Sequence, residues 1–223
     1  MSSARHELTT VILAAGAAQR FGDCKHLLVQ GGKSLLQHRV DAVLEAGLSN
    51  PLIVTGAWHN AIEQMHPHLN LKHHHNWHQG LGSSIAFAMG CVPENARAVL
   101  LLLGDQVAVS NEEIAQLHRR WRQQTDKVVC AHYQHAPGVP AVFPRSLFPA
   151  LRELDGDRGA KALLEANANS LHTIPMPSAA IDIDTPEDWQ RWQNTQHELT
   201  EPLTGHQTEP QTRPENSGDA LWN

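Results

Sequence analysis

Apolar runs of the kind that form buried strands alternate along this chain with segments that carry helix start and stop signals. Thr9–Ala14 is a β-branched apolar run, and Ala98–Leu103 is apolar throughout. Continuous runs of this kind are typical of parallel strands that are covered on both faces. Ser34–Ala46 and Asn111–Thr125 follow the pattern of helices. The alternation predicts an α/β fold, a single doubly wound (Rossmann-like) and mostly parallel sheet with helices on both faces.

Shorter segments continue the alternation. We expect strands at Leu52–Thr55, Leu71–His74 and Lys127–His132, and helices at Ala57–Met65 and Ser83–Met89. Ser110, with Glu113 three residues later, predicts a capping box at the start of the helix that begins at Asn111. Because it contains proline and glycine, the segment Pro137–Pro140 is expected to leave the sheet and return.

The last third of the chain contains one further strand pattern and a change of composition. Ala180–Asp184 alternates apolar and acidic residues, which predicts a half-buried strand. Thr185 as N-cap and Pro186 at the first helical position predict a helix directly after it. From position 198 the sequence is polar, so we expect one domain over residues 1–197 and a polar, disordered tail over 198–223.

Composition limits the classes of protein to consider. With 223 residues, 41% of them hydrophobic, the chain can form one sizeable core. Its net charge of −6 argues against a broad nucleic-acid surface. No apolar run has the length that spans a bilayer, and the three cysteines show no CxxC spacing. We therefore expect a cytoplasmic protein that binds neither nucleic acid nor membrane.

The stretch from Leu13 to Lys25 predicts a loop that holds a polyphosphate. Its first residues after the strand are alanine and glycine, so backbone N–H groups can approach an anion closely. Arg20 adds a fork of donors for phosphate oxygens, and Lys25 adds a movable positive charge. The alternative is an ordinary strand-to-helix turn with two solvated cations.

Three carboxylates suggest a metal near that loop. Asp105 follows a buried strand directly, which is where ligands bind in open α/β sheets. Asp182 and Asp184 lie two apart on an expected strand and would share one face. One of them can join Asp105 around a metal. Because Mg²⁺ is commonly bound by one or two carboxylates plus substrate phosphates, this small set of acids suits it.

Two other segments approach known motifs without completing them. Gly80–Ile85 has two of the three glycines of a dinucleotide fingerprint, and it is better described as a glycine turn with two serines that can hold a polar edge of a ligand. His73–His75 and His78 lack a supporting Cys or Asp motif for zinc, and we expect them to form a solvated, pH-sensitive edge.

Taken together, the chain resembles the MobA-like nucleotidyltransferase family, most closely its molybdenum cofactor cytidylyltransferase branch. The matching segments run in family order and are Leu13–Gly16 with Arg20, Gly22 and Lys25, then Asn76–Ser84, Leu103–Gln106, Gly138–Arg145, Gly156–Ala160 and Asp182–Asp188. The resemblance implies a nucleotide-diphospho-sugar transferase type of fold. It also implies transfer of CMP from CTP to the phosphate of molybdopterin with release of pyrophosphate, and Mg²⁺, or alternatively Mn²⁺, as cofactor.

The resemblance assigns roles to particular residues. The expected nucleotide-binding residues are Leu13, Ala14, Ala15, Gly16, Arg20, Lys25, Gly82 and Ser83, of which Gly82 and Ser83 would border the base and ribose. The expected catalytic residues are Arg20, Lys25 and Asp105, the expected metal ligands are Asp105, Asp184 and Asp182, and the acceptor-side candidates are Asp157 and Arg158. The pair Ala14-Ala15, where the guanylyl branch usually has Ala-Gly, favours cytosine over guanine.

Departures from the family pattern leave other acceptors and other roles open. Val107 stands where the family usually has proline, and His132–Pro137 lacks the usual Arg-Gly pair, both on the acceptor side. The alternatives are transfer from CTP or another NTP to a sugar or alcohol phosphate, and a non-catalytic cofactor-binding chaperone. Two cations and two carboxylates argue against the chaperone. A recipient molybdoenzyme or its chaperone is the protein partner that the resemblance implies.

Overall fold

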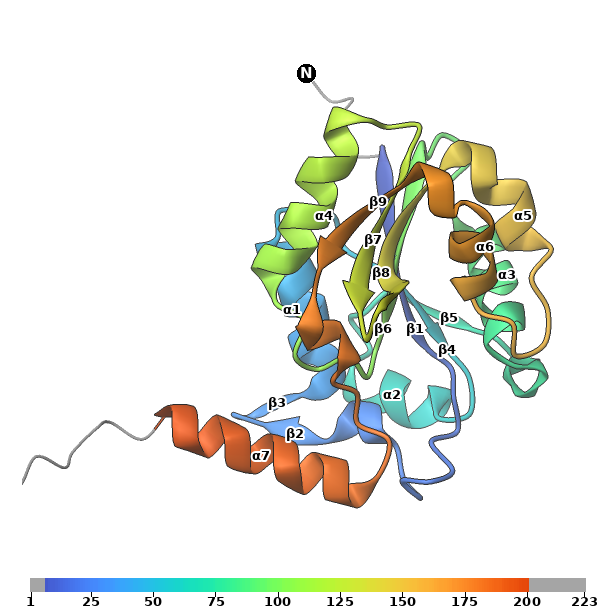
Figure 1. Ribbon diagram of the computed structural model, residues 1–223. Helices are drawn as coiled ribbons and strands as arrows, with labels where there is room; N and C mark the ends of the chain where they lie inside the picture. Colours follow the sequence, from blue (N-terminus) through green and yellow to red (C-terminus); the bar gives the residue numbers. More distant parts are fainter. Residues whose placement is uncertain (1–6, 201–223) are drawn as a thin grey trace, which may run out of the picture.

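A computed structural model describes residues 7–200 of the chain, with side chains up to Gln196, as one central sheet with helices on both faces (Figure 1). The seven strands of the sheet are β1 (Leu8–Ala14), β4 (Leu52–Thr55), β5 (Leu71–His73), β6 (Ala98–Leu103), β7 (Val128–Tyr133), β8 (Ala136–Pro144) and β9 (Leu171–Pro175). A separate hairpin pairs β2 (Val29–Gln30) with β3 (Lys33–Ser34).

The sheet order is β5-β4-β1-β6-β8-β7-β9. Its first four strands run parallel to one another, and β9 runs parallel to β7. β8 is the exception, because it pairs antiparallel with both β6 and β7. The mostly parallel sheet that the sequence predicts is therefore confirmed, and β1 lies between β4 and β6, where the chain order of the parallel strands reverses.

Residues 7–200 contain seven α-helices, and the last of them follows the final strand. They are α1 (Leu35–Glu45), α2 (His59–Met65), α3 (Leu81–Cys91), α4 (Asn111–Gln123), α5 (Phe148–Arg152), α6 (Lys161–Ala166) and α7 (Pro186–Thr200). Alternate residues of β1 divide between the two sides of the sheet. Ile12 packs into a core with α1, α2 and α4, and Val11 packs into a second core with α3, α5 and α6. Helices on both faces are the doubly wound arrangement that the sequence predicts.

Local signals in the sequence predict several elements to the residue. The strands at Leu52–Thr55 and Ala98–Leu103 have the expected bounds. α4 starts with the predicted capping box, in which the Ser110 hydroxyl accepts from the Glu113 N–H and the Glu113 carboxylate accepts from the Ser110 N–H. These elements depend on neighbouring residues alone, which explains why their pattern is sufficient.

Pro137–Pro140 does not leave the sheet, so that expectation is wrong. The segment belongs to β8, and the pairing with β7 passes from Cys130 opposite Ala141 to Ala131 opposite Gly138. The ladder thereby skips Val139 and Pro140 as a bulge. A bulge lets a strand accommodate a proline that cannot donate a ladder hydrogen bond.

Ala180–Asp184 is not a strand, which is a second correction. A 3₁₀ turn, η6 (Pro177–Ala180), ends at its first residue, and the rest has no regular structure. Of the two isoleucines in Ala180–Asp184, Ile183 is buried (1% exposed), whereas Ile181 is 44% exposed. The Ile183 N–H donates to the Asp105 carbonyl, so the segment crosses the end of β6 instead of pairing along it.

The C-terminal helix α7 lies beside the β2–β3 hairpin (Figure 1), where the Trp192 indole N–H donates to the Gln30 side-chain oxygen at 2.8 Å. The helix continues to Thr200, three residues into the segment expected as a tail, and positions 201–223 lie outside the described residues. Within residues 7–200, no helix has the length and apolarity needed to cross a membrane.

Candidate active site

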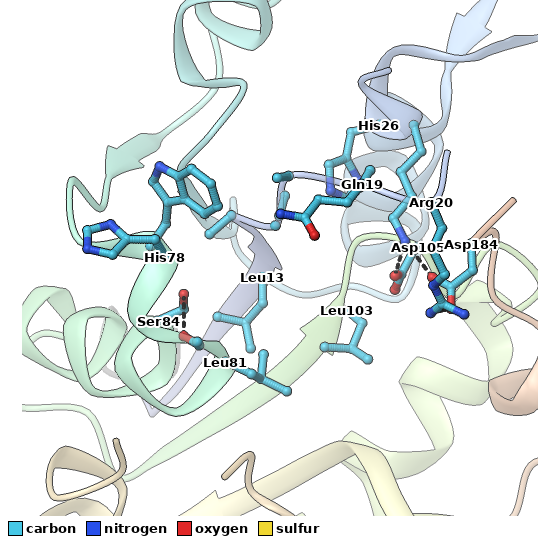
Figure 2. Close-up of a pocket in the computed structure, with 18 of the residues that line it drawn as sticks. Leu13, Gln19, Arg20, His26, His78, Leu81, Ser84, Leu103, Asp105 and Asp184 are labelled. Atoms are coloured by element: carbon cyan, nitrogen blue, oxygen red, sulfur yellow. Dashed lines mark hydrogen bonds and ion pairs between the residues drawn. The ribbon is translucent and has the colours of Figure 1, made fainter. Parts of the chain in front are cut away.

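A cavity of about 580 Å³ opens at the carboxyl ends of the parallel strands β1 and β6 (Figure 2). One wall is the end of β1 and the turn after it, from Leu13 to Arg20. The opposite wall comes from Leu103 and Asp105 at the end of β6 and from Asp184 before α7. Ligands of open α/β sheets bind in such a crevice, where the order of the strands reverses.

The turn after β1 presents backbone to this cavity. Ala14 and Ala15 are buried, and the chain then emerges at Gly16, which is exposed. Ala18 has a φ of 50°, which is unusual for a residue other than glycine. The structure therefore places the expected nucleotide-binding residues Leu13 to Gly16 on one wall of the cavity.

Lys25 is the centre of an ion-pair network in the same cavity. Its Nζ lies 2.7 Å from Asp105 Oδ2 and 3.0 Å from Asp184 Oδ1. The side chain is 11% exposed, whereas that of Arg20 is 73% exposed and its Nη2 lies 2.5 Å from Asp184 Oδ2. Figure 2 shows Arg20, Asp105 and Asp184 converging at one end of the cavity. Residues that the sequence could only propose separately are thus in contact.

The two carboxylates keep Lys25 charged. Burial lowers the pKa of its ammonium, but the charges and hydrogen bonds of Asp105 and Asp184 more than offset this, and the net pKa is raised. A protonated lysine held between two acids is poised to exchange those partners for phosphate oxygens, which carry the same sign of charge.

The donor set in this cavity fits a magnesium ion that is completed by substrate oxygens. Asp105 and Asp184 both reach the Lys25 ammonium, so their carboxylates lie close enough together to share a cation. Among residues 7–200, no group of three or more His, Cys, Asp or Glu side chains is arranged to hold a metal. Two carboxylates plus phosphates is a coordination that Mg²⁺ accepts.

Asp182 is near these acids but outside the cavity. Burial raises the pKa of its carboxyl, and the charges of Asp184 and Asp105 raise it further. It does not line the cavity, because the segment is not the strand that would have given Asp182 and Asp184 one face. The cavity is therefore lined by Asp105 and Asp184 and not by Asp182.

At the other end of the cavity, the lining residues differ from those that the sequence predicts. Gly82 is buried against the 155–158 segment, where a Cβ would lie 2.4 Å from the Asp155 carbonyl oxygen. The Ser83 hydroxyl lies 2.8 Å from His74 Nε2 and does not line the cavity. His78, Leu81 and Ser84 line this end instead (Figure 2). Gly80 and Trp77 also line the cavity. The expected roles of Gly82 and Ser83 as lining residues are therefore not supported.

The two acceptor-side candidates separate as well. Asp157 lines the main cavity, whereas Arg158 lines neither this cavity nor a smaller one of about 300 Å³ beside it. Both cavities share Leu13, Leu81 and Leu103, and the smaller one continues to the β7–β8 turn and Lys161. The loop around Asp157 thus passes along the boundary between two connected spaces.

Three buried polar residues have no signal in the sequence; His26 lines the cavity, and Gln106 and Arg39 lie close to it. The ring of His26 packs against Gly104, its Nδ1 has no hydrogen-bond partner in the part of the chain that is described, and burial lowers its pKa to about 4. The Gln106 amide donates to the carbonyls of Val139 and Ala179. Arg39 donates to the carbonyl of Gln106. Each contact joins segments far apart in sequence and holds the loop that carries Asp105.

The histidine cluster is only partly the solvated edge that the sequence predicts. His74 is 6% exposed and stacks on Phe87, so it belongs to the packing of α3. His73 stacks on His59 and lies at a tilt of 48° to His75, with ring centroids 4.0 Å apart in both pairs. Burial and these neighbours lower the pKa of His73.

Comparisons with known proteins agree with this geometry. A family model described as the MobA-like NTP transferase domain matches residues 10–172. Three curated relatives are each 25% identical. They are the bifunctional protein GlmU of Heliobacterium modesticaldum (83% of this chain, 42% of that protein), the purine catabolism protein PucB of Bacillus subtilis (82% and 94%) and a probable molybdenum cofactor guanylyltransferase of Nostoc sp. (82% and 89%). The chain spans less than half of GlmU.

Solved structures show the same fold. Rv0371c of Mycobacterium tuberculosis has a TM-score of 0.74 and 23% identity over 84% of this chain and 98% of that one. Its complex with manganese has a TM-score of 0.69 and 23% identity, over 83% of this chain and 97% of that one. A CMP:2-keto-3-deoxy-manno-octonic acid synthetase complexed with CTP has a TM-score of 0.69 and 16% identity, over 86% of this chain and 99% of that one. At these sequence identities the similarity shows a shared fold alone.

Proposed function

Because the chain belongs to the MobA-like NTP transferase domain family, we propose that it transfers CMP from CTP to the phosphate of molybdopterin and releases pyrophosphate. The observation that carries this proposal is the contact of Lys25 with Asp105 and Asp184 opposite the turn after β1. That arrangement combines donors for a polyphosphate with two acids for a divalent cation, and the two are needed together in nucleotidyl transfer.

In the proposed reaction, an oxygen of the acceptor phosphate attacks the α-phosphorus of CTP, and the bond between that phosphorus and the leaving pyrophosphate breaks. This chemistry requires positioning and charge neutralisation, and it needs no covalent nucleophile. Lys25 and Arg20 would release their carboxylate partners and hold the phosphates that become pyrophosphate. Asp105 and Asp184 would hold Mg²⁺, which neutralises phosphate charge when bound.

Support for CTP comes from two sources. Ala15 stands where the guanylyl branch of the family usually has glycine, and it is 6% exposed at the cavity wall. A neighbour of the same fold was solved with CTP. A curated relative is named as a guanylyltransferase, so GTP is the competitor that the experiment must include.

Support for a molybdopterin acceptor comes from that relative's name and from the matched segments. The smaller cavity beside the main one would receive the acceptor, with Asp157 at the boundary between them. The product would pass to a molybdoenzyme or its chaperone. A cytoplasmic site of action agrees with the three cysteines, none of which forms a disulfide.

The test is a matrix of nucleotides and acceptors. Pyrophosphate release is measured with CTP, GTP, UTP and ATP, each against molybdopterin, a hexose 1-phosphate and an alditol phosphate, with Mg²⁺ and with Mn²⁺. The proposal expects the highest kcat/KM for CTP with molybdopterin. A higher value for a sugar or alditol phosphate would assign the acceptor differently. Tight CTP binding without pyrophosphate from any acceptor would favour a non-catalytic carrier.

A further inference from the structure

The turn after β1 is held in a conformation that its own residues disfavour. Ala18 lies in the left-handed region with a φ of 50°. A residue with a Cβ is unfavourable in that region, and such a conformation persists where the surrounding structure fixes it. The carbonyl of Ala18 accepts hydrogen bonds from the N–H groups of Phe21 and Gly22, which closes the turn from within. These internal bonds leave the orientation of the turn on the sheet to other contacts.

The segment after β4 supplies those contacts. β4 lies beside β1 in the sheet (Figure 1), and the chain continues from it into Gly56, Ala57 and Trp58. The Ala57 N–H donates to the Ala15 carbonyl at 3.1 Å, and the Trp58 indole N–H donates to the Ala17 carbonyl at 3.0 Å. Two successive residues after β4 therefore hold two alternate carbonyls of the turn.

The close approach of these two segments depends on Gly56. A Cβ at this position would lie 2.4 Å from the Ala15 carbonyl oxygen and 2.5 Å from the Trp77 Cβ. Glycine thus lets the turn after β1, the segment after β4 and the Trp77 wall of the cavity meet at one point. The contact is part of the cavity's construction, because Ala15 and Trp77 both line it.

Trp58 is itself held in place. Its ring is half-buried and packs against the core on the α1, α2 and α4 side of the sheet. The Thr55 hydroxyl lies 2.8 Å from His59 Nδ1, which ties the first residue of α2 to the end of β4. Because packing already fixes the indole, its hydrogen bond to the Ala17 carbonyl costs little further side-chain entropy. A flexible donor would lose more entropy in making the same bond.

We infer that Trp58 is a positioning residue for substrate, which fixes the turn that receives the triphosphate through its indole N–H. The inference rests on the proposed function, since it concerns the site that binds the nucleotide. Trp58 does not line the cavity and contacts the turn through the Ala17 carbonyl. Removing the indole N–H should therefore weaken the affinity for CTP, because the turn is less well fixed, and should leave the affinity for the acceptor unchanged.

Trp58→Phe removes the indole N–H and keeps an aromatic ring. Trp121→Phe is the matched control. Trp121 lies on α4, and its indole N–H donates to the Thr125 carbonyl at 3.2 Å; neither residue lines the cavity. We expect Trp58→Phe to raise the Kd of Mg·CTP roughly 3- to 10-fold, the scale of one lost hydrogen bond. Trp121→Phe should lower stability toward urea without changing that Kd.

The outcomes separate the inference from the proposed function. If wild-type protein binds no nucleoside triphosphate in calorimetry, the proposed function fails, and the inference fails with it. If wild-type protein binds CTP and Trp58→Phe binds it within twofold, the inference alone is overturned. An equal rise in the KM for the acceptor would also overturn it, because that indicates general loosening of the fold.

A measurement on wild-type protein covers the case in which Trp58→Phe does not fold. In NMR spectra, the indole N–H resonance of Trp58 should exchange slowly with solvent and shift when CTP is added. The indole resonance of Trp121 serves as the internal reference and should not shift. The positioning role would be refuted if the backbone resonances of residues 15–19 shift on addition of CTP and the indole resonance of Trp58 does not.

Discussion

Replacing Lys25 with methionine should have opposite effects on two binding partners of the site. The Lys25 ammonium bridges Asp105 and Asp184 in the structure, so it competes with any divalent cation for the same carboxylates. Lys25→Met keeps an unbranched side chain that is one atom shorter, and it removes the charge. We therefore expect the variant to bind Mn²⁺ more tightly in the absence of nucleotide and to lose turnover in its presence.

The magnitude follows from the distances. Mg²⁺ binds carboxylate oxygens at about 2.1 Å, and the Nζ lies 2.7 and 3.0 Å from the two oxygens. A cation on those oxygens would lie within about 5 Å of the ammonium. Repulsion between a single and a double positive charge at about 5 Å is ~1.7 kcal/mol even with the dielectric constant of water. That corresponds to roughly 15-fold in Kd.

Mn²⁺ binding to nucleotide-free protein is measured by electron paramagnetic resonance, at the same pH for every variant. Lys33→Met is the control, because Lys33 makes an ion pair of similar length, 2.6 Å, with Asp41 and lies outside the cavity. We expect the Kd for Mn²⁺ to fall tenfold or more in Lys25→Met and to stay unchanged in Lys33→Met.

Turnover provides the second half of this prediction. Losing one preorganised electrostatic partner of the transition state lowers turnover by about 100- to 1000-fold. If Lys25→Met binds Mn²⁺ no more tightly than wild type, the ammonium does not compete with a cation for these carboxylates, and the reasoning from the ion pairs is refuted. Near-normal turnover at saturating Mg²⁺ would remove Lys25 from the proposed reaction.

Three further predictions concern other parts of the molecule. Asp105→Asn should lower turnover by about 100- to 1000-fold, and a Mg²⁺ titration that restores normal turnover would contradict its role. Ser110→Ala removes the hydroxyl that caps α4 and should lower the free energy of unfolding by about 1 kcal/mol in urea titrations, with KM unchanged. Burial lowers the pKa of His26 to about 4, so the unfolded imidazole, with an ordinary pKa of about 6.5, takes up a proton that the folded one does not. The free energy of unfolding should therefore decrease as the pH falls from about 6.5 to 4. In His26→Leu this decrease should be smaller, by up to about 1.4 kcal/mol per pH unit.

The sequence predicts the end of the cavity that carries Lys25 and Asp105, because most of its residues lie in short local segments. Leu13 to Lys25 form one strand end and one turn, and Asp105 directly follows a strand whose bounds are evident from its composition. Such features depend on a few neighbouring residues. Contacts between distant segments then bring the turn and the acid together, and parallel pairing of β1 with β6 is sufficient to do so.

The sequence does not predict which residues line the other end of the cavity, because this depends on the rotational phase of helix α3. α3 begins at Leu81, two residues before the expected start. Each residue turns a helix by about 100°, so the direction of a side chain depends on details that the pattern does not contain. Ser84 consequently lines the cavity, while Ser83 points to His74.

Asp184 lines the cavity although the sequence assigns it to the wrong element. The sequence places it on a strand, whereas the structure holds it at the start of α7. The Asp188 carboxylate accepts from the N–H groups of Asp184 and Thr185, at 3.1 and 2.8 Å, and the Thr185 hydroxyl accepts from the Asp188 N–H at 3.2 Å. This reciprocal cap is the helix start that the sequence does predict. Because the cap fixes the backbone of Asp184 itself, the same four residues that begin a helix also aim a carboxylate at Lys25, and the site needs no strand there.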